Sequence, residues 1–372
     1  MRILGIKKWA VLAVILAGSI PWDANALSFT VTDLGTLGGN NSGGSDINDS
    51  GQVTGYSYTT GNSAAHAFLY DGTMHDLGTL GGTLSEGYGI NDSGQVTGYS
   101  YTTGDSAYHA FLYDGTMHDL GTLGGTGSSG NGINDSGQVV GGSFTSGNSA
   151  FHAFLYDSVN GMLDLGTLGG TYSSGSGIND SGQVVGYSGT SGNSASHAFL
   201  YDGNMHDLGT LGGTSSTGRG INDSGQVVGD SYTSGNSARH AFLYDGIMHD
   251  LGTLGGTYSY GNGINDSGQV VGGSYTSGDS AYHAFLYDGV DGMLDLNDLI
   301  DPLSGWTLGY ARDINNFGQI TGYGTYNGQT HAFILTPDTP PAVVPIPAAA
   351  PLALLGMGLV SALGRRRKSV QI

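Results

Sequence analysis

Eleven histidines recur at two kinds of position, which makes them the first candidates for metal chemistry. Seven open a His-Ala-Phe motif: His66, His109, His152, His197, His240, His283 and His331. Four others precede an aspartate: His75, His118, His206 and His249. Zinc ligands lie about 2 Å from the ion, but strands about 4.8 Å apart would hold equivalent histidines of neighbouring repeats much farther apart. We expect structural hydrogen bonds and no cofactor, with a pair such as His66 and His75 as the alternative for a metal.

The acidic residues give little support to catalysis or calcium binding. Glu86 is the only glutamate, so a pair of glutamates for sugar hydrolysis is impossible, whereas aspartate pairs stay open. Near-identical repeats would also build near-identical sites, which is unusual for an enzyme. The recurring Asn-Asp-Ser-Gly segments lack the Asp-x-Asp-x-Asp alternation of calcium loops. They predict turns, with calcium as an alternative.

Two variable columns suggest a binding surface. The residue two before each Ile-Asn motif is Ser45, Tyr88, Asn131, Ser176, Arg219, Asn262 or Arg312, and the residue before each His-Ala-Phe includes Arg239. The residues of these columns either face solvent and vary because nothing constrains them, or they bind a ligand. For the second case we predict that Arg219 and Arg312 converge on one anionic group, with Tyr88 and Arg239 as further contacts to a sugar or an anion.

These residues are positioned by one repeated unit. Asp-Leu-Gly-Thr-Leu-Gly-Gly, Ile-Asn-Asp-Ser-Gly-Gln-Val and His-Ala-Phe recur in fixed order, and the His-Ala-Phe spacings are 43, 43, 45, 43, 43 and 48. Such a period is typical of propellers and solenoids. In the second unit we expect a Gly-rich strand around Ile90, then strands at 95–101, 109–113 and 116–120, the last two joined by an Asp-Gly hairpin turn.

The two ends of the repeat region are complementary fragments of this unit. It opens with a lone fourth strand at 29–34 and closes on a first, second and third strand near 335. A propeller joins its chain ends in one blade in this way. We therefore predict an all-β fold at 27–337, a seven-bladed β-propeller of four-stranded blades closed by the N-terminal strand. A β-solenoid is the alternative.

The three motifs together resemble the HAF family of probable extracellular repeat proteins, over the chain from about Phe29 to Leu335. The resemblance implies an extracellular repeat protein with no established reaction and no named ligand.

Both termini predict export. Basic residues, an apolar run and Ala24-Asn25-Ala26 are typical of a secretory signal peptide at 1–26. After a linker at 338–344, the segment 345–372 contains an apolar stretch long enough to span a bilayer and then an Arg cluster. With Val344, Pro345, Pro347, Arg365, Arg366 and Arg367, it resembles the PEP-CTERM sorting signal in a Val-Pro-x-Pro-Ala variant, with Ile346 where that motif has Glu. The resemblance implies an exosortase-type partner and transient anchoring in the inner membrane.

Charge and cysteine content narrow the function further. The segment 27–339 holds three Arg, no Lys and 29 acidic residues, a formal charge of −26, so nucleic acid is not an expected partner. Cysteine is absent, which excludes disulfides and thiolate chemistry. We expect an exported, non-catalytic repeat protein of the cell surface or exopolysaccharide matrix, a scaffold that interacts with carbohydrate or with protein, with exopolysaccharide as a candidate partner. A secreted propeller enzyme acting on polysaccharide or phosphate esters is the alternative.

Overall fold

The computed structural model describes residues 27–339, which form strands joined by turns and short 3-10 helices. The predicted signal peptide, the sorting signal with Val344, Pro345, Pro347 and Arg365 to Arg367, and most of the predicted linker lie outside the described residues. Within the described segment, no helix is long and apolar enough to cross a membrane. The prediction of an all-β fold is confirmed.

The strands follow the repeat, and each kind has its own length. The first strands are the longest: β2 Gly38–Ile47, β6 Gly81–Ile90, β10 Gly124–Ile133, β14 Gly169–Ile178, β18 Gly212–Ile221, β22 Gly255–Ile264 and β26 Trp306–Ile314. The second strands are β3 Val53–Thr59, β7 Val96–Thr102, β11 Val139–Thr145, β15 Val184–Thr190, β19 Val227–Thr233, β23 Val270–Thr276 and β27 Ile320–Tyr326. The third strands carry the His-Ala-Phe motifs: β4 Ala65–Tyr70, β8 Tyr108–Tyr113, β12 Phe151–Asp157, β16 Ser196–Tyr201, β20 Arg239–Tyr244, β24 Tyr282–Asp288 and β28 Gln329–Pro337.

The fourth strands are short, and 3-10 turns link many of the strands. The fourth strands are β5 Met74–Asp76, β9 Met117–Asp119, β13 Gly161–Gly166, β17 Met205–Asp207, β21 Met248–Asp250 and β25 Gly292–Asp295. The 3-10 turns are η1 Thr60–Asn62, η2 Thr103–Asp105, η3 Ser146–Asn148, η4 Ser191–Asn193, η5 Ser234–Asn236, η6 Ser277–Asp279 and η7 Leu296–Asp298.

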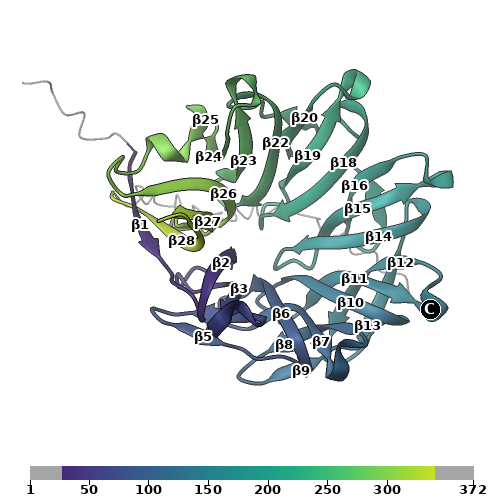
Figure 1. Ribbon diagram of the computed structural model, residues 1–372. Helices are drawn as coiled ribbons and strands as arrows, with labels where there is room; N and C mark the ends of the chain where they lie inside the picture. Colours follow the sequence, from purple (N-terminus) through teal and green to yellow (C-terminus); the bar gives the residue numbers. More distant parts are fainter. Residues whose placement is uncertain (1–26, 340–372) are drawn as a thin grey trace, which may run out of the picture. The chain divides into compact units, whose positions relative to one another are not determined.

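Within a repeat the strands pair antiparallel in chain order, as β2, β3, β4 and β5 do. The last set lacks a fourth strand of its own, and β1 (Phe29–Asp33) pairs antiparallel with β28 instead, with Phe29 opposite Pro337. Figure 1 shows β1 beside β28, although the two strands lie at opposite ends of the sequence. The chain ends of the described segment thus share one four-stranded sheet, β1-β28-β27-β26.

The expected strands of the second unit match β7, β8 and β9 within two residues at each end, but the first strand is longer than expected. It begins at Gly81, which pairs with Thr102. The Gly-Gly pair that ends the Leu-Gly-Thr-Leu-Gly-Gly segment is therefore part of the strand. A Cβ at Gly82 would lie 2.6 Å from the Tyr101 backbone oxygen, so only glycine fits this close approach.

Neighbouring repeats are joined by the Ile-Asn-Asp motif. The side-chain amide of Asn91 donates to Gln95 Oε1 (2.8 Å) in its own turn and to the Asn134 carbonyl (3.1 Å) in the next repeat. The Asp92 amide donates to Asp135 Oδ1 (2.9 Å). The same two bonds run from the last repeat to the first, where Asn315 donates to the Asn48 carbonyl (3.0 Å) and the Asn316 amide donates to Asp49 Oδ1 (2.9 Å).

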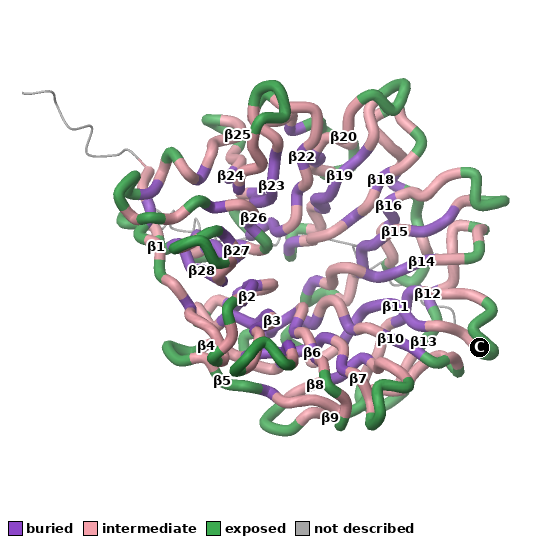
Figure 2. Tube along the Cα trace, viewed as in Figure 1, coloured by how far each residue is buried: buried purple, intermediate pink, exposed green. Residues whose placement is uncertain are grey.

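The core is divided into small clusters, each at a junction between two repeats. Every His-Ala-Phe phenylalanine is fully buried. Phe111, for example, packs with Ile90 and Val96 of its own repeat and with Ala67 and Leu77 of the preceding one. Figure 2 shows this arrangement, with buried segments along the strands and exposed segments at the turns. The clusters share a His-Ala-Phe phenylalanine or alanine in every repeat, so the sheets pack in a similar way.

Candidate functional site

Five positions on one side of every sheet carry most of the differences between repeats. Two lie on the first strand, two on the second and one on the third. The register of the strands places four of them opposite one another, as with Thr217 and Asp230 or Tyr232 and Arg239, and the second first-strand position, such as Arg219, lies at a bulge. We call these positions the variable face. In repeat order they are Gly43, Ser45, Tyr56, Tyr58, Ala65; Glu86, Tyr88, Tyr99, Tyr101, Tyr108; Ser129, Asn131, Gly142, Phe144, Phe151; Ser174, Ser176, Tyr187, Gly189, Ser196; Thr217, Arg219, Asp230, Tyr232, Arg239; Tyr260, Asn262, Gly273, Tyr275, Tyr282; and Tyr310, Arg312, Tyr323, Thr325, Thr330.

The variable face holds all three arginines of the described segment. Two of them share one buried carboxylate in the fifth repeat. Arg219 Nε donates to Asp230 Oδ1 (2.7 Å), and Arg239 Nη2 pairs with the other carboxylate oxygen and donates to Thr217 (3.1 Å). Burial alone would lower the pKa of Arg219, and the Asp230 carboxylate offsets this and raises it.

The third arginine lies on aromatic rings. The Arg312 guanidinium carbon is 4.7 Å from the Tyr310 ring centre and 5.7 Å from that of Tyr323. Arg312 is exposed, and it forms no ion pair with any carboxylate of residues 27–339. Tyr310 stacks on Tyr323 (5.5 Å, 13°) and on Tyr282 of the preceding repeat (5.7 Å, 16°). A series of parallel rings therefore crosses the junction of two repeats, and the cation lies nearest to its middle ring, Tyr310.

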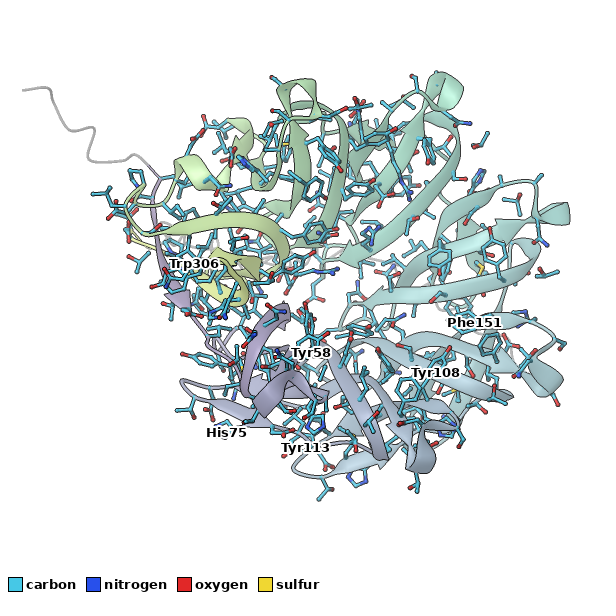
Figure 3. All side chains as sticks on the ribbon, viewed as in Figure 1. Tyr58, His75, Tyr108, Tyr113, Phe151 and Trp306 are labelled. Carbon is cyan, nitrogen blue, oxygen red and sulfur yellow. The ribbon has the colours of Figure 1, made fainter. Side chains whose placement is uncertain are left out.

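A second aromatic group lies in the second repeat. The Tyr88 hydroxyl donates to Glu86 Oε2 (2.9 Å), and the Tyr99 ring lies 5.7 Å from Tyr88 and 5.9 Å from Tyr108. Burial, and then the Glu86 charge, raises the pKa of Tyr88 well above its usual range, so its hydroxyl stays protonated. Figure 3 labels Tyr58, Tyr108 and Phe151, which belong to the variable face of the first three repeats.

The C-terminal ends of the first strands line a cavity of about 330 Å³, which we call the first-strand cavity. Its lining includes Tyr88, Arg219 and Arg312, but Arg239 is not part of it. It also includes Asp46 and Asp313, which stand where the other repeats have Gly. Asp46 Oδ1 (2.9 Å) and Asp313 Oδ2 (3.4 Å) both accept from the Ile47 amide.

The Asp46 and Asp313 carboxyl groups accept from the same Ile47 amide, so they lie against one another at the junction of the last and first repeats. Burial raises the pKa of both, and the neighbouring Asp46 charge raises that of Asp313 further. Most glycoside hydrolases keep their two carboxyl groups about 5 to 9.5 Å apart. Groups in direct contact do not have that geometry, although this is the aspartate pair that the sequence left open.

The histidines bond to aspartates. Each His-Ala-Phe histidine contacts the Asp that begins the Asp-Leu motif, as in the 2.9 Å contact of His66 Nδ1 with Asp76. His75 instead contacts Asp71 in the adjacent turn (2.9 Å). The predicted hydrogen-bonding role is confirmed. Within residues 27–339 no group of three or more His, Asp or Glu side chains is arranged to hold a metal.

The structure brings together three of the four predicted ligand contacts, and it adds a residue that sequence reasoning missed. Arg219, Arg312 and Tyr88 line the same cavity, whereas Arg239 joins Arg219 on Asp230. Asp230 neutralises part of the charge that the predicted two-arginine anion site requires. The sequence did contain a signal for Asp230, because it is the one Asp in a column that otherwise contains Tyr or Gly.

Comparison with solved structures identifies the kind of fold. The chain is similar to the β-propeller domain of the Trilobed protease from Pyrococcus furiosus, which has an open velcro topology (TM-score 0.53, 9% identity, covering 79% of this chain and 93% of that one). Lower similarities are to TolB from Acinetobacter baumannii (TM-score 0.46, 12% identity, 78% and 64% covered) and to a gluconolactonase from Xanthomonas campestris (TM-score 0.40, 12% identity, 84% and 94% covered). No family model and no curated protein sequence matches the chain.

The fold is therefore of the β-propeller type, and the predicted class is confirmed at this level. The alternative of a β-solenoid is not supported.

Proposed function

We propose that this protein is an exported, non-catalytic carbohydrate-binding scaffold of the HAF-repeat kind, built as a seven-bladed β-propeller that β1 closes. The closure is supported by the β1–β28 pairing and by the bonds from Asn315 and Asn316 to the first repeat. The export is supported by the signal-peptide and PEP-CTERM-like patterns at the two ends.

One observation carries the carbohydrate assignment: the variable face combines half-buried tyrosine rings with polar side chains. A tyrosine offers a flat apolar ring to the C–H face of a sugar and a hydroxyl to its hydroxyl groups. The contacts of Arg312, Tyr310 and Tyr282 hold these rings in place before a ligand arrives, which reduces the entropy lost on binding. A polysaccharide chain offers many such sugar faces.

The binding test uses the purified full-length protein and a panel of neutral and acidic oligosaccharides, measured by calorimetry. The double variant Tyr282→Ala, Tyr310→Ala removes the stacked rings, and we expect it to weaken binding at least about tenfold. The matched control is Tyr201→Ala, Tyr244→Ala, which removes two half-buried tyrosines outside the variable face. Equal loss in both variants, or no binding by the parent protein, would contradict the assignment.

The export test is separate. Mass spectrometry of the secreted protein should show a chain that begins at Leu27 and has lost the segment after Pro347. A secreted form that retains Arg365, Arg366 and Arg367 would contradict sorting by an exosortase-type enzyme.

A further inference from the structure

We propose that Arg312 is a carboxylate-recognition residue, and that the sugar bound at this site is acidic, a uronic acid residue of a polysaccharide. This inference rests on the proposed carbohydrate function and names the class of sugar. The evidence for it is which of the few arginines in the described segment form ion pairs and which one does not.

The described segment has few positive charges and many negative ones. Arg219, Arg239 and Arg312 are its only Arg or Lys residues, against a formal charge of −26. Arg219 and Arg239 are engaged by Asp230, which is fully buried. Arg312 alone forms no ion pair within residues 27–339, even though it is surrounded by an excess of carboxylates. A cation left unpaired in such a protein is available to a carboxylate from outside.

No carboxylate of residues 27–339 forms an ion pair with Arg312. Its aromatic neighbours Tyr310 and Tyr323 are uncharged at neutral pH. The adjacent residue, Asp313, follows a bulge at Arg312 and shares the Ile47 amide with Asp46. Arg312 therefore keeps its charge where no neighbouring side chain neutralises it.

The contacts of Arg312 also leave its hydrogen-bonding edge available. A guanidinium is planar, with five N–H donors in the plane and two faces that stack on rings. Tyr310 contacts the group through its ring, and Tyr323 contacts it through its ring and its hydroxyl, which leaves the remaining in-plane donors for a carboxylate. Tyr310, stacked between Tyr282 and Tyr323, fixes the position of this site.

The sugar ring of such a ligand would lie on the variable face, against Tyr282, Tyr310 and Tyr323, while its carboxylate reaches Arg312. None of these tyrosines lines the first-strand cavity, which Arg312 and Tyr88 share with eight aspartates. A uronic acid residue carries both features in one unit.

The experiment compares oligosaccharides that differ only in oxidation at C6, a neutral hexose series and its uronic acid series, with the full-length protein and calorimetry. We expect the acidic series to bind at least about tenfold more tightly at low salt, and Arg312→Gln to abolish this difference. Arg312→Lys keeps the charge but not the fork of donors, so it should restore only part of the preference. His206→Gln, at an exposed position of the short strand β17 outside the variable face, should change nothing.

The other outcomes separate the two proposals. If both series bind equally and Arg312→Gln changes neither, the acidic assignment is wrong and the carbohydrate function stands. If neither series binds, the carbohydrate function fails as well. Free glucuronate or polyglutamate that binds as tightly as the acidic oligosaccharide would overturn recognition of a sugar chain, because the carboxylate alone would then be sufficient.

Discussion

We expect Phe29 to stabilise the pairing of β1 with β28, where the two ends of the described segment meet; we call this pairing the seam. Its side chain is 4% exposed and packs in a cluster that includes Leu296, Ile300, Leu308 and Phe333. Its amide donates to the Leu299 carbonyl (2.9 Å). Phe29→Ala removes this packing, and a buried Phe→Ala substitution costs about 3–5 kcal/mol. Total stabilities are about 5–15 kcal/mol, so the loss is a large fraction.

We expect the effect of Phe29→Ala to depend more on where stability is lost, in β1, than on how much free energy of unfolding is lost. β1 has only β28 as a ladder partner, so weakening β1 lowers the free energy of a local opening at the seam. A loss of about 3–5 kcal/mol would speed exchange of the β28 amides that bond to β1 by roughly 10²- to 4 × 10³-fold, since about 1.4 kcal/mol is a factor of ten. The opened form exposes a strand edge, and we expect it to aggregate.

The assay is native-state hydrogen exchange, read by mass spectrometry, together with light scattering. The control is Phe154→Ala, which removes a fully buried phenylalanine from an internal repeat. The free energy of global unfolding should fall by a similar amount in that variant. Its β28 amides, however, should still exchange no faster than the amides of its internal strands. If the two variants show the same exchange pattern, or if Phe29→Ala leaves β28 unchanged, the reasoning about the seam is wrong.

Three further predictions concern the charged groups. Burial raises the pKa values of Asp46 and Asp313, so the folded protein holds a proton that the unfolded chain has already released. The free energy of unfolding should therefore fall as the pH rises from the ordinary carboxyl range through the raised pKa values, by up to about 1.4 kcal/mol per pH unit for one proton. Asp313→Asn should flatten the dependence of the urea midpoint on pH. Asp230→Asn leaves Arg219 and Arg239 without their carboxylate and should destabilise by about 3 kcal/mol in chemical denaturation, unlike Asp291→Asn at an exposed turn. His240→Gln breaks a partly exposed pair with Asp250 and should cost less than about 1 kcal/mol, and added zinc should leave the melting temperature of the parent protein unchanged.

The repeat made most of the local structure predictable from the sequence. Asp114-Gly115, β-branched residues and the fixed motif order located the strands β7, β8 and β9 because these signals act over a few residues. The start of β6 was not predictable in the same way. Gly81 and Gly82 look like turn residues, and only the close approach of Tyr101 and Thr102 explains why they belong to a strand.

The candidate site was predictable in its columns but not in its contacts. Variation marked Arg219, Arg312 and Arg239 as positions of the variable face, since a position that differs among near-identical repeats is not required for packing. The partners of these residues could not be inferred, because Asp230 reaches Arg219 and Arg239 only through the register of β18, β19 and β20. Stacking of Tyr282 on Tyr310 likewise depends on how two successive sheets approach each other.

Asp46 and Asp313, at the junction between the last and first repeats, test the inference that positions which differ among the repeats are not required for packing. Elsewhere this position is Gly, and at Gly89 an added Cβ would lie 3.1 Å from the Gly132 backbone, so successive first strands come close. Asp46 and Asp313 occupy the same position only in the repeats that contain the two chain ends, and they contact one another there. A departure from the repeat that occurs in two adjacent units and forms one contact is best explained as a property of their junction. The departure at Arg312, by contrast, leaves guanidinium donors free, which is the property expected of a surface that binds a ligand.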